Sequence, residues 1–462
     1  MKRIIAACAV VAACFTAALQ AAGEVREYTL ENGMKVLVKP DHRAPVAVSQ
    51  VWYKVGSSNE YNGITGISHV LEHMMFKGTK ALPAGRFSAI IAANGGEENA
   101  FTSRDYTAYY QFLGSDRLEI SFELEADRMR NLLLPEADFQ KERQVVREER
   151  FMRTEDKPEA LTYERFNAVA SLNGPYRNPV IGWDEDLEAL TVDDLRAWYE
   201  TYYAPNNATL VVVGDVEPDA IFTLAKKHFG KLKAANPPVD KPRVDKPRGE
   251  PEQRGERRLR IHAPAKVPYV LIGYQVPSLK TAGEAWEPYA LDVLAGILDG
   301  GSSARLSSEL IRKQEIAASA SAGYNLTAKY QTLFMLDANP TEKHSIEEVE
   351  KALYQQVEKL QQALASDAEI KRVKAQVIAS KVYELDSVQQ LANQMGALET
   401  VGLGWQLMDQ YPEKIKAVTA EQVRAVARKY LIEKHRTVAV LVPEEVGDGR
   451  QQTTEKEASD EG

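Results

Sequence analysis

Apolar and polar positions along the chain follow both helical and strand periods, which predicts a mixed α+β fold. Short runs rich in β-branched and apolar residues indicate strands, and longer amphipathic stretches indicate helices. The dipeptide Asn32-Gly33 between the first two runs is typical of a hairpin turn. Residues 179–186 are expected to form an irregular loop. Strands are expected at 28–30, 35–38, 46–55, 106–112 and 207–213, and helices at 66–78, 87–93, 117–131, 138–154 and 191–203.

The end of the first half of the chain is repeated in the second half. Helix caps are predicted at Thr191 and at Thr419, and an apolar strand follows each of them, at 209–213 and 437–441. The offset is 228 residues in both comparisons. Because a duplicated unit explains such matches, we expect two homologous α/β-sandwich-like domains.

The composition divides the chain further. Val-Asp-Lys-Pro-Arg occurs twice in succession, at 239–243 and 244–248, and proline in such a charged run gives an extended connector. The end of the chain is polar and charged, which predicts disorder. The expected segments are a signal peptide at 1–22, an N-terminal domain at 23–232, a linker at 233–256, a C-terminal domain at 257–443 and a disordered tail at 444–462.

The first 22 residues have the three-part layout of a secretory signal peptide. Two basic residues precede an apolar run over 4–19, and small residues close that run, which disfavours a permanent anchor. A lipoprotein cleavage box at 11–14 would leave an unusually short leader. Both cysteines, Cys8 and Cys14, lie in this segment, so the exported chain would have no thiol. We therefore expect a periplasmic protein without a lipid anchor.

The charge and hydropathy of the chain limit its partners. The formal net charge of −9 and the acidic isoelectric point argue against nucleic acid as the main partner. Beyond the leader, no run has the eighteen or so apolar residues that a bilayer span requires. No stable membrane span is expected.

His69, Glu72 and His73 form the strongest chemical signal in the sequence. On a helix, the two histidines stand one turn apart with Glu72 on the same side. Two imidazoles at this spacing can bind one zinc ion, and the carboxylate can reach a water on the metal. The order H-x-x-E-H is that of inverted-motif metallopeptidases. The alternative is that two histidines fall by chance on a core-facing helix.

A third ligand is not fixed by the residues alone. The other histidines are scattered along the chain, at His42, His228, His262, His344 and His435. A carboxylate on the helix over 138–154 is the candidate. Glu142 and Glu149 are seven positions apart and share a face, whereas Glu148 points elsewhere. This pair could equally be a solvated charged face.

Three motifs in order resemble the pitrilysin, insulinase and mitochondrial processing peptidase family of zinc peptidases. They are the segment 66–79, the tetrapeptide Asn99-Ala100-Phe101-Thr102 and the Glu142/Glu149 pair. The similarity extends from about residue 28 to about residue 442, which is typical of a half-size bacterial member.

The resemblance implies a role for each matched residue. It implies one zinc ion per chain, bound by His69, His73 and Glu149, with Glu72 as the catalytic base. It implies that Glu142 orients a ligand histidine. It also implies that Asn99 and Ala100 lie on an edge strand to which an extended substrate adds.

The second half departs from the family pattern. It has no histidine near residue 297, where the offset would place a second metal site. Arg312 matches an arginine that, in family members active as single polypeptides, holds the substrate backbone together with a tyrosine. The place of that tyrosine falls on Ala318 or Ser319, and the next tyrosine is Tyr324. We therefore expect half of a clamshell, completed by a homologous subunit that carries the Arg/Tyr pair or by a second copy.

The function implied is a secreted zinc endopeptidase that cleaves peptides or unfolded polypeptides in a closed chamber. One alternative is a non-catalytic scaffold subunit, and another is a processing peptidase that cuts at defined sites. Scaffold relatives usually lose ligand positions, whereas His69, Glu72, His73 and Glu149 are all present. This favours an enzyme.

Overall fold

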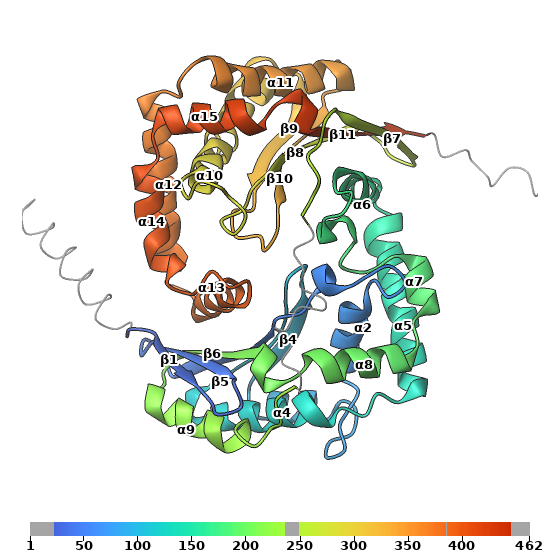
Figure 1. The fold of residues 1–462 in the computed structure, drawn as a ribbon, viewed down its shortest axis with the longest axis vertical. Coiled ribbons are helices and arrows are strands. Elements are labelled where there is room, and N and C mark those ends of the chain that lie inside the picture. The colour runs from blue at the N-terminus through green and yellow to red at the C-terminus, as the bar shows by residue number, and fades with distance from the viewer. Residues whose placement is uncertain (1–22, 236–248, 385, 445–462) are drawn as a thin grey trace, which may run out of the picture.

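The computed structural model describes residues 23–235, 249–384 and 386–444 (Figure 1). The expected signal peptide, residues 236–248 of the expected linker and residues 445–462 of the expected tail lie outside these ranges. Within them, a sheet covered by helices occurs twice, once in each half of the chain. None of the helices in this part of the chain combines the length and hydrophobicity that a membrane crossing requires.

The first sheet holds six strands in the order β1-β2-β6-β3-β5-β4. They are β1 (Arg26–Thr29), β2 (Lys35–Pro40), β3 (Val46–Tyr53), β4 (Glu97–Thr102), β5 (Thr107–Gly114) and β6 (Ala208–Gly214). Neighbours are antiparallel except β2 and β6, which are parallel. On one face of the sheet, an apolar core is shared with α2 (Ile67–Met74), α4 (Leu118–Asn131), α5 (Glu136–Arg150), α8 (Val192–Tyr202) and α9 (Pro218–His228). The strand β4 forms an edge, beside which α3 (Arg86–Ala93) lies.

The second sheet repeats this topology without the first strand. Its order is β7-β11-β8-β10-β9, with β7 and β11 parallel and the other neighbours antiparallel. The strands are β7 (Arg257–Ala263), β8 (Tyr269–Val276), β9 (Ala317–Tyr324), β10 (Thr332–Pro340) and β11 (Arg436–Pro443). Its core includes α10 (Glu287–Leu298), α11 (Ile346–Gln362) and α15 (Ala420–Tyr430). Capping boxes at Thr191 and Thr419 begin α8 and α15, which lead to the equivalent strands β6 and β11, so the predicted duplication is confirmed.

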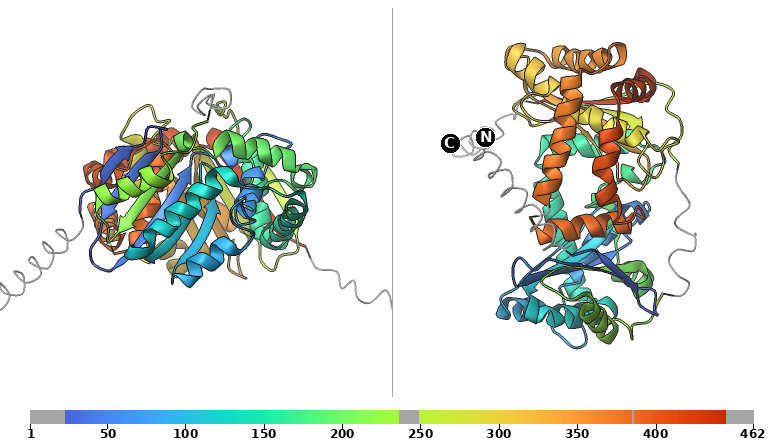
Figure 2. Two further views of the ribbon diagram at one scale, coloured as in Figure 1. Left: turned by 90° about the horizontal axis from the view of Figure 1, so that it is seen from below. Right: turned by 90° about the vertical axis from the view of Figure 1, so that its left-hand side faces the viewer.

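Each domain places one helix on the free face of the other domain's sheet. Alternate residues of a strand point to opposite faces, so a sheet that is apolar on both faces needs two covers. In the second sheet, Leu271 and Ala439 pack against Phe166 of α6 (Pro158–Ala170), which belongs to the first half of the chain. In the first sheet, Trp52 packs against Met395 of α13 (Val388–Thr400). The helices α12 (Asp367–Glu384) and α14 (Leu407–Ala417) connect α13 to the second domain (Figures 1 and 2).

Two glycines allow these helices to approach closely. A Cβ atom at Gly396 in α13 would lie 2.0 Å from the ring of Trp52. A Cβ atom at Gly273 in β8 would lie 2.6 Å from the ring of Phe166. Neither separation is sterically possible. A side chain at Gly396 would push α13 away from the first sheet, and a side chain at Gly273 would push α6 away from the second sheet.

A buried polar contact also joins the two domains. The hydroxyl of Tyr176 donates to Asp105 and accepts hydrogen bonds from the backbone N–H groups of Lys329 (2.9 Å) and Tyr330 (3.3 Å). Asp105 accepts a further bond from the hydroxyl of Ser58 (2.9 Å). This contact fixes the β9–β10 loop of the second domain against the β4–β5 turn of the first.

Several expected boundaries differ from the structure, among them the end of the predicted helix over 66–78, because α2 ends at Met74. The predicted helix over 138–154 begins earlier as α5, and beyond Arg150 it continues as the π-helical turn η3 (Phe151–Glu155). The end of the predicted loop at 179–186 forms the helix α7 (Asp184–Ala189). Three acidic residues in the first turn of α7 favour this helix, because carboxylates interact favourably with a helix N-terminus.

Candidate metal centre

The helix α2 begins after a left-handed glycine and beside a buried carboxylate. Gly66 precedes the helix with a φ of 85°, a left-handed conformation that glycine adopts readily. The carboxylate of Glu60 accepts hydrogen bonds from the N–H groups of Gly66 (2.7 Å) and Ser68 (2.9 Å). Burial raises the pKa of Glu60 to about 7, although both backbone bonds act in the opposite direction. The first turn of α2 is therefore tied to the loop before it.

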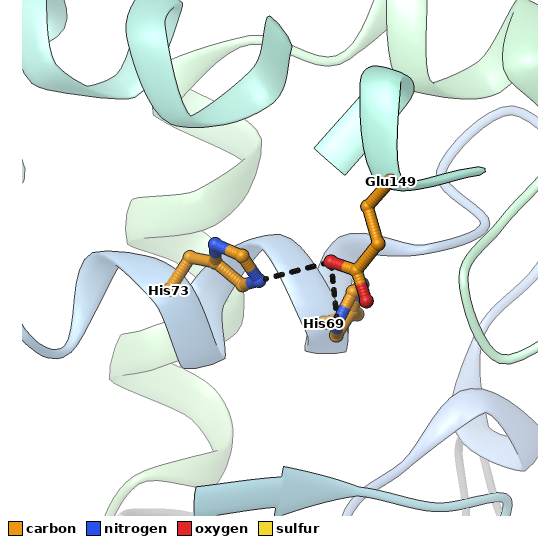
Figure 3. Close-up of side chains that lie close together, drawn as sticks. All are labelled: His69, His73 and Glu149. Carbon is orange, nitrogen blue, oxygen red and sulfur yellow. Dashed lines mark ion pairs between the residues drawn. The ribbon is translucent and has the colours of Figure 1, made fainter. Parts of the chain in front are cut away.

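Three side chains converge beside α2 (Figure 3). The Nε2 atoms of His69 and His73 lie 3.8 Å and 3.5 Å from the same oxygen, Oε2 of Glu149. Candidate ligand atoms of all three residues lie within 4.8 Å of one another. Four ligands at the usual zinc distances stand about 3.4 Å apart in a tetrahedron. The set of two nitrogens and one carboxylate oxygen therefore fits zinc with an open position.

The surroundings of the histidines suit metal binding. Burial, followed by the nearby His73 and Arg153, lowers the pKa of His69 to about 3, so its imidazole is neutral. The second ring nitrogen of His73, Nδ1, lies 3.3 Å from Oε2 of Glu142. Lys77 forms an ion pair with the other oxygen of Glu142 at 2.8 Å. A proton on Nδ1 that is held by Glu142 leaves the Nε2 lone pair free for a metal.

Glu72 lies beside this group and is not one of the three candidate ligands. Burial raises the pKa of its carboxyl, whereas a hydrogen bond from the hydroxyl of Thr102 lowers it. Because Thr102 ends β4, Glu72 is linked to the edge strand that also carries Asn99 and Ala100. The outer edge of β4 has no strand partner in the described part of the chain.

A groove of about 840 Å³ runs along these residues. It is lined by the three candidate ligands, by Glu72 and by the β4 segment from Asn99 to Thr102. A second cavity, of about 330 Å³, lies at the domain junction and shares Ser103 and Arg104 with the groove. The predicted residues His69, Glu72, His73, Asn99, Ala100 and Glu149 therefore meet at one groove, with Glu142 behind His73.

Arg312 is not brought to this groove. It lies on the π-helical turn η6 (Leu306–Lys313), is exposed, and donates a hydrogen bond to the carbonyl of Ser302. Ala318 and Ser319 lie on β9. Tyr324 lines the junction cavity, and its hydroxyl donates to the carbonyl of Pro277 (2.6 Å). The role of Arg312 stays a prediction.

Sequence reasoning missed three arginines that line the groove, Arg104, Arg153 and Arg177. Arg153 forms an ion pair with Glu149 at 2.7 Å, and its spacing of four residues was a signal that could have revealed it. Arg104 follows the Asn-Ala-Phe-Thr motif closely. Arg177 had no signal, because it comes from a loop distant in sequence.

Comparisons with known proteins identify the family to which the chain is similar. The family model described as Insulinase (Peptidase family M16) matches residues 35–183, and the model described as Peptidase M16 inactive domain matches residues 189–377. The zinc protease PqqE of Helicobacter pylori is 34% identical over 418 residues, which cover 90% of this chain and 92% of that protein. A probable mitochondrial-processing peptidase subunit beta of Arabidopsis thaliana is 26% identical over 91% of this chain and 79% of its own length.

Solved structures show the same fold. A protease from Helicobacter pylori superposes with a TM-score of 0.85 at 33% identity and covers 91% of this chain and 100% of its own. The periplasmic protease PqqL of Escherichia coli has a TM-score of 0.76 at 19% identity, covering 91% of this chain and 48% of its own, which compares the fold alone. The two-domain fold and the inverted H-x-x-E-H motif are typical of one class of metallopeptidases. The chain belongs to peptidase family M16.

Proposed function

We propose that the chain is a secreted zinc-dependent endopeptidase that hydrolyses peptides or unfolded polypeptides. The observation that carries this proposal is the convergence of His69, His73 and Glu149 beside Glu72 and the free edge of β4. Relatives that bear the name zinc protease support it. The expected leader at 1–22 and a structural neighbour titled as a periplasmic protease support a periplasmic location.

Each of these residues would have a separate role in the proposed hydrolysis. Zinc held by the three ligands would supply a Lewis acid that activates water and the scissile carbonyl. Glu72 would accept the proton of the attacking water and pass it to the departing amine. Thr102 would orient Glu72 through their hydrogen bond. The edge of β4 would hold an extended substrate by backbone hydrogen bonds.

We further propose that the active form is a clamshell of two homologous subunits that enclose the substrate. Arg312 lines neither the groove nor the junction cavity, and Ala318 and Ser319 occupy the expected place of the tyrosine. A partner that carries an Arg/Tyr pair would supply what this chain lacks. A homodimer is the alternative, and full activity of the purified chain as a homodimer would contradict the heterodimer.

Matched substitutions test the catalytic proposal. Glu72→Gln should retain stoichiometric zinc and abolish hydrolysis of a quenched fluorescent peptide, because it removes the base and leaves the ligands. His73→Ala should lose zinc and activity together. Glu148→Gln, on the exposed face of α5, is the control and should change neither. Metal content is measured by plasma mass spectrometry. Retained turnover in Glu72→Gln, or retained zinc in His73→Ala, would contradict the assigned roles.

A further inference from the structure

The groove beside the metal centre carries positive charge that no acidic side chain of the described residues neutralises. Its charged lining beyond the metal group consists of Glu164, Arg104, Arg153 and Arg177. Glu164 is buried and forms two hydrogen bonds with Arg150, so it is already paired. Arg153 is paired with Glu149. Arg104 and Arg177 are left without a carboxylate partner in the part of the chain that the structure describes.

Arg104 is held in the groove by contacts that leave its charge available. Its guanidinium lies 5.1 Å from the centre of the Tyr176 ring, and Nη2 makes a long contact of 3.4 Å with the hydroxyl of Tyr163. The adjacent Asp105 does not pair with it. Both oxygens of Asp105 accept hydrogen bonds instead, from Ser58 on one side and from Tyr176 on the other.

Arg177 also has no carboxylate partner within the described residues. One of its terminal nitrogens donates to the carbonyl of Leu172 (3.1 Å), and its Nε atom is buried without a hydrogen-bond partner within the described residues. A guanidinium binds a carboxylate through two parallel hydrogen bonds, more strongly than it binds neutral acceptors. A substrate carboxylate that reaches the terminal nitrogens of Arg104 or Arg177 would give that arginine the charged partner that it lacks in the described residues.

The direction of β4 decides which part of a substrate meets Arg104. The strand runs from Glu97 to Thr102, and Arg104 follows two residues later. A peptide that adds antiparallel to β4, as β5 does on the other side, runs in the opposite direction. Its residues on the amino-terminal side of the bond that faces Glu72 then pass Arg104 and enter the junction cavity.

We propose that Arg104 and Arg177 select substrates with an acidic side chain on the amino-terminal side of the scissile bond. The groove would thus favour acidic peptides. This inference rests on the proposed peptidase function, and binding measurements separate the two. A charge-assisted hydrogen bond at a partly buried site supports a preference of about tenfold for glutamate over glutamine.

The test uses extended peptides that differ only by Glu, Gln or Lys at each of several positions before the cleavage site. Binding is measured by fluorescence anisotropy with the zinc-loaded Glu72→Gln chain, and kcat/KM with the active enzyme. We expect about tenfold tighter binding of one Glu peptide than of its Gln counterpart. Arg104→Gln and Arg177→Gln should each reduce this ratio towards one, and Arg104→Glu should favour Lys. Arg117→Gln, on the exposed turn η2 (Ser115–Arg117), is the matched control and should keep the ratio.

Each outcome decides one proposal. Equal binding of Glu and Gln peptides, no binding of either, a preference on the carboxyl-terminal side only, or a ratio that survives both arginine substitutions overturns the inference. Selective binding without hydrolysis by any assembly of the wild-type chain overturns the peptidase function and leaves only the recognition of acidic peptides by the two arginines. If Arg104→Gln does not fold, as judged by circular dichroism, Arg177→Gln and Arg104→Lys, which retains the charge, provide the comparison.

Discussion

Replacing Glu142 with glutamine tests how the structure positions His73. Glu142 bridges two donors, with one oxygen 3.3 Å from Nδ1 of His73 and the other 2.8 Å from Nζ of Lys77. A glutamine keeps the shape of this side chain but presents one oxygen and one NH₂ group. Because both neighbours are donors, one of them must face the NH₂ group in either orientation of the amide. The substitution therefore weakens the hold on His73 without creating a cavity.

The expected magnitude follows from the geometry. Removing an outer partner of a ligand histidine typically costs about 10- to 100-fold in metal affinity, which corresponds to about 1.4 to 2.8 kcal/mol. We expect the Glu142→Gln chain to fall in this range. The zinc dissociation constant is measured at neutral pH by competition with a chromophoric chelator.

Glu148→Gln is the matched control for this experiment. It removes the same charge from the same helix, one residue before Glu149, but its side chain is exposed. It therefore reproduces the loss of long-range attraction for a cation without touching His73. If Glu142→Gln and Glu148→Gln bind zinc with the same affinity as the wild-type chain, the proposed orientation of His73 by Glu142 is wrong.

Two further predictions concern the stability of the elements that hold the groove. Phe166→Ala should lower the free energy of unfolding, measured by urea titration, by about 3 to 5 kcal/mol, because Phe166 is fully buried between the domains. The control Leu172→Ala removes an exposed side chain and should change the free energy of unfolding by less than about 0.5 kcal/mol. Equal effects would contradict the packing of α6 on the second sheet. The pKa of Glu60 is raised from 4.5 to about 7, so the folded chain holds a proton on Glu60 that the unfolded chain has already lost. The stabilisation by this proton is fully present below pH 4.5 and is lost as the pH rises through 7. The stabilisation lost over this range is roughly 3 kcal/mol. The stability difference between the wild-type chain and Glu60→Gln should therefore change with pH across this window, and parallel pH curves would contradict the raised pKa.

The elements that carry the candidate ligands could be predicted because their signals are local. The spacing of His69 and His73 predicts the helix α2, and the seven-residue spacing of Glu142 and Glu149 places both on one face of α5. The repeated helix caps and strands predict the duplication, which the common sheet topology confirms. The predicted end of this helix at residue 154 was wrong, because the π-helical turn that follows Arg150 carries no periodic signal of its own.

The exchange of helices between the domains was missed for a physical reason. The apolar face of α6 gives no indication of which sheet it covers, and its residues lie more than a hundred positions from their partners in β8. Gly273 and Gly396 are informative only once their neighbours are known. Arg104 and Arg177 were missed because an arginine in a loop is ordinarily a solvated residue, and only the absence of nearby carboxylates distinguishes these two.

The exchange gives the second domain a role in the metal site although the candidate ligands all come from the first domain. One side of α6 supplies Tyr163 and Asn167 to the groove, and its other side packs on the second sheet through Phe166. The contact between Tyr176 and the β9–β10 loop fixes a wall of the junction cavity, which adjoins this groove. The first domain alone would expose the apolar side of α6 and lose one wall of the junction cavity. The second domain therefore supports the groove indirectly, because it covers the apolar side of α6, and it supplies one wall of the adjoining junction cavity.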